Sequence, residues 1–163
     1  MIAMRDLTRA FTQAGCVDVQ SVVQSGNVIF RPPAATVAAL DRVRQDVQRR
    51  LGGEVIMLFR TLREVERLVD SDPFETFTAE PTLKLYVAFH ERAPRGATFP
   101  FRSERERLEA IGGGGKEVFI VSARKPSGFY GFPNNFVEDV LGVRATTRNW
   151  STIMRISALA GHD

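Results

Sequence analysis

Two short polar stretches carry the side chains of this chain that are best suited to hold a ligand. The first is Gln24-Ser25-Gly26-Asn27, which lies between two apolar runs. The second is Thr146-Thr147-Arg148-Asn149-Trp150-Ser151-Thr152. Neither stretch has the apolar spacing of a core segment, so we expect both to serve a functional surface. The predicted ligand-binding residues are Gln24, Ser25, Asn27, Arg148, Asn149 and Trp150.

Arg148 has the clearest chemistry of the six. Its guanidinium offers five N–H donors in a planar fork, which suits an anion or the edge of a base. A helix is expected to begin at Trp150, and the N-terminus of a helix favours negative charge nearby. A structural role is the alternative for the neighbouring residues: Asn149 can cap that helix, and Trp150 can pack on a sheet.

No combination of residues indicates catalysis or a bound metal. The chain has two histidines, His90 and His162, and one cysteine, which give no metal-ligand spacing and no evident catalytic base. Ser25 lies in no G-x-S-x-G sequence. The glycines at 112–115 are expected to follow a helix and precede a strand, which is the reverse of a phosphate-binding loop. We therefore predict no catalytic residue, no metal and no cofactor.

The composition is that of an ordinary globular protein. Of 163 residues, 44% are hydrophobic and 25% are charged, which is enough to bury a core. The single cysteine, Cys16, excludes an internal disulfide. No apolar run approaches the roughly 18 residues of a membrane helix, and the first residues lack the apolar core of a signal peptide. We expect a cytoplasmic location and no membrane partner.

Two features leave contact with nucleic acid open. The net charge of +3 permits such contact but does not require it. The arginines at 42–50 alternate with acidic residues, which is typical of a solvated helix face. The run Phe129-Tyr130-Gly131-Phe132 could form a stacking platform for bases or another flat ligand. Aromatic residues more often close the end of a sheet, which is the competing interpretation.

Apolar spacing and turn residues predict the elements of the chain in order. The first part is expected to contain a helix over 2–14, a hairpin of strands at 17–23 and 27–31, a helix over 34–51, a buried strand over 54–60 and a helix over 61–71. Residues 72–82 contain two prolines and are predicted to link two halves. The second part is expected to contain a strand over 83–89, a helix over 103–111, strands at 117–121 and 124–132, a helix over 134–141, a strand over 143–149 and a helix over 150–160.

The two parts repeat one order of elements if the first part lacks an opening strand. A β-α-β-β-α-β unit is the ferredoxin-like split motif, an antiparallel sheet with both helices on one face. The predicted fold is therefore α+β, with two tandem ferredoxin-like halves. We place the halves at residues 1–75, which are truncated, and 76–163, packed together as one compact unit.

The two polar stretches together resemble the bacterial family called domain of unknown function 1697. The resemblance is carried by residues 24–30 and 146–152, and it extends over essentially the whole chain. Lys84-Leu85-Tyr86-Val87-Ala88-Phe89 is similar to the mid-chain strand of the family, and the helix with Met4, Arg5 and Leu7 is similar to its first helix. The resemblance implies a compact α+β fold of ferredoxin-like halves and no established activity.

The chain departs from the family pattern in two places. Ser151 stands where the family usually has asparagine, which keeps a hydrogen-bonding side chain. Family members open with an apolar strand and a Gly-rich loop that carries an arginine, and nothing in this sequence corresponds to them. We therefore expect a gap in the first-half sheet beside 27–31 or 55–59, or a strand supplied by another segment or chain. A start codon assigned too far downstream would explain the difference.

The favoured hypothesis is a binding module for a small anionic or nucleotide-like ligand, with Trp150 as an apolar wall. One alternative is a nucleic-acid-binding protein that uses the arginine-rich helix and the aromatic residues at 129–132. A second alternative is an enzyme whose cofactor supplies the chemistry. The sequence does not identify the partner. Salt dependence separates the first two hypotheses, since binding through many phosphates weakens steeply as salt rises.

Overall fold

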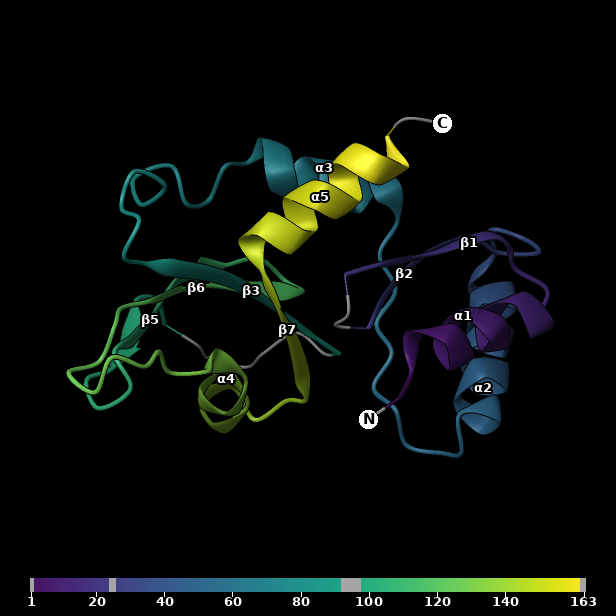
Figure 1. Cartoon of the computed structure of the whole chain (residues 1–163), viewed down its shortest axis with the longest axis horizontal. Helices are drawn as coiled ribbons and strands as arrows, with labels where there is room; N and C mark the ends of the chain where they lie inside the picture. Colours follow the sequence, from purple (N-terminus) through teal and green to yellow (C-terminus); the bar gives the residue numbers. More distant parts are fainter. Residues whose placement is uncertain (1, 24–25, 92–97, 162–163) are drawn as a thin grey trace. The chain divides into compact units, whose positions relative to one another are not determined.

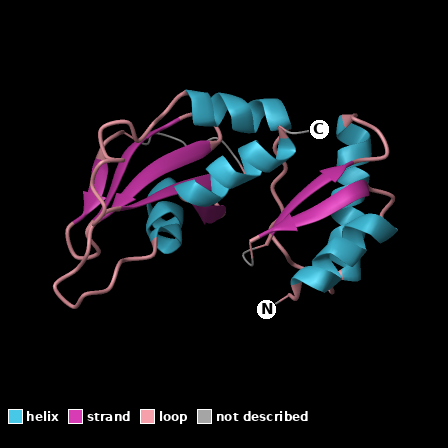
Figure 2. Ribbon diagram, turned by 45° about the horizontal axis from the view of Figure 1, so that its top comes forward, coloured by secondary structure: helices cyan, strands magenta, loops and turns pink. Residues whose placement is uncertain are grey.

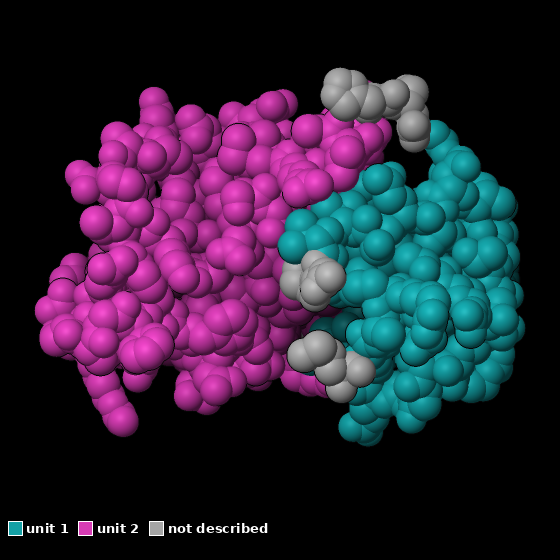
Figure 3. All heavy atoms as spheres, in the orientation of Figure 1, with its two compact units in different colours: residues 1–57 teal, residues 58–163 magenta. Residues whose placement is uncertain are grey.

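The chain forms two compact units in a computed structural model, which describes residues 2–23, 26–91 and 98–161. Unit 1 is Met1–Met57 and unit 2 is Leu58–Asp163, and Figure 3 colours them separately. The division lies earlier than the one predicted after residue 75. Residues 58–75 pack with the second unit, and Phe74 is fully buried in the core of that unit. Whether the two halves pack as one body stays a prediction.

Unit 1 contains the predicted helix, hairpin and helix (Figure 1). The elements are α1 (Met4–Gln13), β1 (Val17–Val22), β2 (Asn27–Arg31) and α2 (Val37–Arg50). β1 and β2 are antiparallel, with Ser21 opposite Val28, which confirms the predicted hairpin. Its turn at Gln24 and Ser25 lies outside the described residues.

The core of unit 1 forms where the apolar stripes of its helices meet the hairpin. Leu7 and Phe11 of α1 are buried one turn apart, and the ring of Phe11 lies 4.8 Å from that of Phe30 in β2. α2 buries Val43 and Val47 at the same spacing. Thr36 begins α2 by accepting a hydrogen bond from the backbone N–H of Ala39. The 3.6-residue period of the apolar positions therefore accounts for both helices.

The predicted buried strand over 54–60 is wrong. These residues are in no strand, and the apolar run from Val55 to Phe59 is half-buried. Two side chains of α2 bind its backbone instead. Gln48 Nε2 donates to the carbonyl of Val55 at 2.8 Å, and Arg44 Nε donates to that of Met57 at 3.2 Å. Among the described residues the sheet of unit 1 has two strands, β1 and β2.

Unit 2 is built around one antiparallel sheet with strand order β4-β5-β6-β3-β7. Its elements are α3 (Leu62–Asp70), β3 (Lys84–His90), β4 (Phe101–Ser103), β5 (Leu108–Gly113), β6 (Glu117–Ser122), α4 (Pro133–Leu141), β7 (Ala145–Asn149) and α5 (Trp150–Ala160). β3 lies between β6 and β7 and is almost completely buried. The predicted strands at 83–89, 117–121 and 143–149 and the last two helices are thereby confirmed.

Helices cover both faces of this sheet (Figures 1 and 2). α4 packs through Val137 and Leu141 on the face that carries Ala88 and Ile120. α3 and α5 pack on the opposite face, which carries Val87. A ferredoxin-like unit has both helices on one face, so the structure does not confirm the tandem ferredoxin-like arrangement. The coarser prediction, an α+β protein with antiparallel sheets, is confirmed.

The predicted helix over 103–111 is wrong, because this segment is a β-hairpin. Ser103 Oγ does accept a hydrogen bond from the backbone N–H of Glu106 at 3.2 Å, as a helix cap would. Arg107 then takes a φ of +52°, which turns the chain back instead of continuing a helix. Leu108 and Ala110 are buried at alternate positions of β5, which is the period of a strand. The glycines at 112–115 accordingly lie at a strand–strand connection.

Within the described ranges, no helix has both the length and the apolar character that a membrane crossing requires.

Candidate functional site

The structure places the six predicted ligand-binding residues in different surroundings. Gln24 and Ser25 lie outside the described residues. Asn27 opens β2 in unit 1, is 9% exposed, and donates from Nδ2 to the carbonyl of Val22 at 3.1 Å across the hairpin. The other three, at positions 148–150, lie in unit 2 at the junction of β7 and α5. That the two stretches share one surface stays a prediction.

Arg148 and Asn149 lie on opposite faces of the sheet. Arg148 is paired with Val87, which belongs to the core beneath α3 and α5. Its Nη1 donates to Thr146 Oγ1 at 2.7 Å and to the carbonyl of Thr147 at 3.0 Å. Burial lowers the pKa of its guanidinium. Asn149 is exposed and is paired with Tyr86 on the face that carries α4.

Trp150 is a core residue. It is 6% exposed, and its ring lies 5.3 Å from that of Phe74 in an edge-to-face contact. The indole packs with α3 and α5 on one face of the sheet. This is the structural role considered as the alternative, and it leaves little ring surface to serve as a ligand wall. Asn149 is at the N-cap position of α5, but its side chain makes no capping hydrogen bond.

A partly buried polar network fixes β7 against α4. Glu138 accepts a hydrogen bond from the backbone N–H of Ala145 at 3.0 Å and another from Asn134 Nδ2 at 3.1 Å. Thr147 Oγ1 donates to Asn134 Oδ1 at 2.8 Å. The network joins the first two turns of α4 to two residues of the strand. It therefore determines where the end of β7, and with it Asn149, is held.

The predicted return strand over 124–132 is wrong in part, because the segment forms a tight hairpin loop. A single bridge pairs Arg124 with Tyr130. Lys125 N donates to the carbonyl of Phe129, and Gly128 N donates to that of Lys125, both at 2.9 Å. Gly128 has a φ of +88°, which glycine adopts at low cost. Backbone hydrogen bonds therefore fix the position from which Phe129 projects.

The base of this loop is fixed to the turn between β4 and β5. A Cβ at Gly131 would lie 2.6 Å from the carbonyl oxygen of Glu106, so only glycine fits there. Lys125 Nζ lies 3.3 Å from a carboxylate oxygen of the same glutamate. Ser122 Oγ donates to the carbonyl of Gly131 at 3.3 Å. Contacts with two other segments thus hold the loop.

Two cationic side chains lie close to the ring of Tyr130 at this end of the sheet. Lys84 Nζ is 4.5 Å from the centroid of its ring, and the guanidinium carbon of Arg124 is 5.6 Å from it. The hydroxyl of Tyr130 donates to the carbonyl of Thr82 at 2.6 Å. Neither Lys84 nor Arg124 forms an ion pair with a residue that the structure describes.

Two phenylalanines beside this cluster are exposed rather than buried. Phe129 is 74% exposed and Phe132 is 65% exposed. The ring of Phe132 makes an edge-to-face contact with that of Tyr86 at 6.4 Å. Burial, together with the nearby Tyr130, raises the pKa of Tyr86. The interpretation that these aromatics close the end of the sheet therefore fails for the two phenylalanines.

We group these neighbouring residues under one name, the aromatic rim. Asn149 belongs to it, because a residue directly opposite Tyr86 in an antiparallel pair projects from the same face. The members of the aromatic rim are Lys84, Tyr86, Arg124, Phe129, Tyr130, Phe132 and Asn149.

Sequence reasoning singled out the aromatic run and Asn149 but missed the two cations of the rim. A signal for them was present. Lys84 lies at the start of the strand predicted over 83–89, and Arg124 follows the strand over 117–121. In an antiparallel pair the start of one strand lies beside the end of the other, and Lys84 is indeed opposite Ser122.

No group of three or more His, Cys, Asp or Glu side chains in the described part of the chain is placed to hold a metal ion.

The comparisons with known proteins identify a family and nothing finer. Neither a curated protein nor a solved structure matches the chain. The family model described as "protein of unknown function (DUF1697)" matches residues 1–119. The matched region includes the first polar stretch and Lys84, whereas the second polar stretch and the loop at 124–132 lie beyond it. The chain belongs to the DUF1697 family.

Proposed function

We propose that this protein binds a nucleotide-like group on the aromatic rim of unit 2. The base stacks on the exposed rings of Phe129 and Phe132, and the phosphate lies against Lys84 and Arg124. The amide of Asn149 provides a donor and an acceptor for the edge of the base. No catalytic role is assigned to any residue.

The observation that carries this proposal is a pair of cations on the ring of Tyr130, Lys84 and Arg124, which form no ion pair with a described residue. The exposed phenylalanines at 129 and 132 flank this tyrosine in the sequence. An isolated exposed apolar side chain needs no explanation in a globular protein. Here two large rings are exposed at 74% and 65%, and a held loop presents them. Aromatic faces bind bases of any sequence, and Lys and Arg bind the phosphates that accompany them.

The fixed loop also supports binding because little of it has to become ordered. Immobilising a flexible side chain or loop costs roughly 0.5–1.5 kcal/mol for each rotamer-rich side chain. Phenylalanine has two rotatable side-chain bonds, and the backbone around Phe129 is already fixed by hydrogen bonds. Most of the stacking free energy is therefore available for affinity.

Single-stranded nucleic acid is the second candidate ligand, and a specific observation favours it. The rim offers two separate exposed rings, Phe129 and Phe132, and such platforms take successive bases of a strand. The arginine-rich helix α2 adds less than expected. Its Arg44 pairs with Asp41, and Arg49 and Arg50 share Asp46, which is the solvated-face arrangement. Any nucleic-acid contact would then rest on unit 2.

The test is a titration of the full chain with adenosine 5′-monophosphate and, separately, with a single-stranded deoxyadenosine octamer. Binding is followed by backbone amide chemical shifts. We expect saturable shifts for Lys84, Tyr86 and residues 128–132. Phe129→Ala should weaken binding by about 1–3 kcal/mol, the usual contribution of one stacked base. Leu159→Ala, which truncates an exposed apolar residue on α5, is the matched control and should leave affinity unchanged.

Charge and length separate the two candidate ligands. Arg124→Gln should weaken both, and Arg155→Gln on α5 is its charge-matched control. If the octamer binds much more tightly than the mononucleotide and its affinity falls steeply with salt, single-stranded nucleic acid is the ligand class. Shifts that appear elsewhere, or equal losses in Phe129→Ala and Leu159→Ala, would contradict the proposal.

A further inference from the structure

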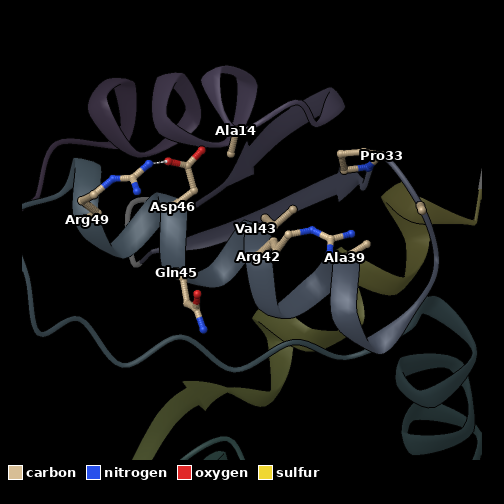
Figure 4. Close-up of a pocket in the computed structure, with 9 residues that line it drawn as sticks. Ala14, Pro33, Ala39, Arg42, Val43, Gln45, Asp46 and Arg49 are labelled. Carbon is tan, nitrogen blue, oxygen red and sulfur yellow. Dashed lines mark hydrogen bonds and ion pairs between the residues drawn. The ribbon is translucent and has the colours of Figure 1, made fainter.

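Unit 1 has a surface hollow of about 450 Å³ (Figure 4). No residue of the aromatic rim lines it. Binding pockets for small molecules commonly measure roughly 300–1,000 Å³, so the hollow has room for a small molecule. The hollow lies between the C-terminal end of α1, the connection after β2 and one face of α2. Its lining residues are Ala14, Pro33, Ala34, Ala39, Arg42, Val43, Gln45, Asp46 and Arg49.

Small side chains keep this hollow open. Ala14 at the end of α1, Ala34 in the connection and Ala39 on α2 each contribute a single methyl group. Gly15, at φ +94°, lets the turn after α1 approach Pro33 so closely that a Cβ would lie 3.2 Å from the proline Cγ. Two of the apolar lining residues, Val43 and Ala39, are almost completely buried and so lie at the bottom of the hollow.

The rim of the hollow carries an excess of positive charge. Arg42, Asp46 and Arg49 recur at the spacing of one helix face, and in Figure 4 Asp46 binds Arg49. The same carboxylate also binds Arg50 Nε at 3.2 Å, so one anion serves two guanidiniums. Arg42 forms no ion pair with any residue in the described ranges, and Figure 4 shows its side chain extended toward Ala39 and Pro33.

We propose that this hollow binds a small organic anion, namely a carboxylate or phosphate carried on a compact apolar body. The apolar body contacts Val43, Ala39 and Pro33, and the anionic group is bound by the Arg42 guanidinium. A guanidinium suits both kinds of anion, because its paired N–H groups match two oxygens of either. The net positive charge around the hollow disfavours a cationic ligand, and the buried apolar side chains of Val43 and Ala39 favour an organic anion over an inorganic one.

This site is independent of the nucleotide-like site proposed for unit 2. The two sites share no residue, and each is contained within its own unit. Amide chemical shifts distinguish them, because a ligand in the hollow perturbs Ala14, Ala34 and Ala39, whereas a ligand on the aromatic rim perturbs residues around Tyr130. Either proposal can therefore fail without affecting the other.

The test is a titration of the full chain with benzoate, phenyl phosphate and the neutral analogue benzyl alcohol, followed by amide chemical shifts. Benzoate and phenyl phosphate represent the two possible anionic groups, and their relative affinities show which one the site prefers. We expect saturable shifts at the hollow with at least one anion, and at least about tenfold weaker binding of benzyl alcohol. Arg42→Gln should weaken binding of the anion about 5–10-fold. Arg9→Gln on α1 removes the same charge from unit 1 outside the hollow and should change affinity less than about twofold.

A filling variant tests the cavity separately from the charge. Ala14→Leu places three more carbons in the hollow and should abolish the shifts while the far-ultraviolet circular dichroism stays unchanged. If this variant does not fold, the affinities of Arg42→Gln and Arg9→Gln for the anion decide whether the hollow is the binding site. Equal binding of benzyl alcohol, equal effects of the two arginine variants, or the absence of saturable shifts at the hollow with both anions would overturn the proposal.

Discussion

Two apolar runs of this chain have similar composition, but only one of them forms a strand. Residues 55–59, Val-Ile-Met-Leu-Phe, are extended but in no strand, and they are half-buried. β3 carries the comparable run Leu-Tyr-Val-Ala-Phe and is the most buried strand of unit 2. β3 is hydrogen-bonded on one side to β6 and on the other to β7. Residues 55 and 57 bind side chains of α2 through their carbonyls instead.

The difference shows that an apolar extended run becomes a strand only where other strands supply its ladder. Each backbone amide and carbonyl needs a partner once it is removed from water, and a sheet is one way to provide it. The run at 55–59 has no adjacent strand among the described residues, so Gln48 and Arg44 provide partners for two carbonyls. High β-propensity therefore means that a segment fits well into a sheet, and it produces a strand only where neighbouring strands are present.

The largest expected effect comes from truncating the core that α5 shares with the sheet. Trp150→Ala should destabilise unit 2 by about 3–5 kcal/mol, since the indole is almost completely buried. Leu159→Ala on the same helix is the control, because Leu159 is 38% exposed. Denaturant unfolding measures both. Trp150 is the only tryptophan, so native emission should be blue-shifted. If Trp150→Ala destabilises the protein no more than Leu159→Ala does, and the emission of the parent chain is red-shifted, Trp150 is exposed and could serve as a ligand wall.

Identical substitutions in the two regions test the comparison directly. Ile120→Ala in β6 removes a fully buried side chain and should cost about 2–5 kcal/mol. Ile56→Ala in the unpaired run truncates a half-buried side chain and should cost less than about 1.5 kcal/mol. The reason is that Ile56 has less buried apolar surface to lose than Ile120. Chemical denaturation of both variants gives the two values. Equal costs would show that the run at 55–59 is packed as tightly as a strand.

Removing the polar network between α4 and β7 should have an intermediate effect. Glu138→Ala leaves the backbone N–H of Ala145 and the amide of Asn134 without their acceptor, at a cost of about 1–3 kcal/mol. Asp139→Ala, which removes the adjacent exposed carboxylate, should be close to neutral. The thermal midpoints of the two variants can be compared with that of the parent chain. A shift of the same size in both would mean that charge, rather than hydrogen bonding, is responsible.

The smallest expected effect concerns Glu64, at the point where the chain leaves the unpaired run and begins α3. Burial alone would raise its pKa, but the backbone N–H of Thr61 and the ammonium of Lys116 outweigh burial and lower it. A lowered pKa in the folded state stabilises the fold above the unfolded value of 4.5, and this contribution is lost as pH falls through the folded value. The side chain is about one-third exposed, so the effect should stay within about 1 kcal/mol.

The corresponding measurement is the stability difference between Glu64→Gln and the parent chain at pH 7 and at pH 3. The difference should be present at pH 7 and should shrink at the lower pH. Glu66→Gln, an exposed position on the same helix, serves as the control. A difference that grows as the pH falls would contradict the assigned direction of the pKa shift.

The sequence predicted the elements whose local signals agree with their surroundings. The helix around Leu7 and Phe11, the hairpin from Val17 to Arg31, the buried strand β3 and the helix that begins at Trp150 all follow from periodicity and turn residues. Gly142 ends α4 at φ +66°, a conformation that glycine commonly adopts just after a helix. Most of these features depend on contacts close in sequence, and β3 is the exception, because its ladders are formed with β6 and β7.

The predictions that failed depend on contacts that the local sequence does not contain. Residues 103–111 begin with a genuine capping hydrogen bond at Ser103, but the alternation of Leu108 and Ala110 matters only because β6 lies beside them. The exposure of Phe129 and Phe132 follows from a loop fixed by Gly131 against another hairpin. Arg42 could be recognised as basic from the sequence, but its lack of an ion pair could not. The sequence alone therefore could not predict all the residues of either candidate site.

The glycine at position 131 has a consequence for the kinetics of binding. The close approach of Gly131 to the carbonyl of Glu106, together with the backbone hydrogen bonds of the hairpin loop, holds the segment that carries Phe129. If the proposed ligand binds the aromatic rim, it therefore meets a surface that is already formed, and we expect association at the rate of encounter rather than of loop closure. Differences in affinity among related ligands should then appear in their residence times, while association rates remain nearly constant.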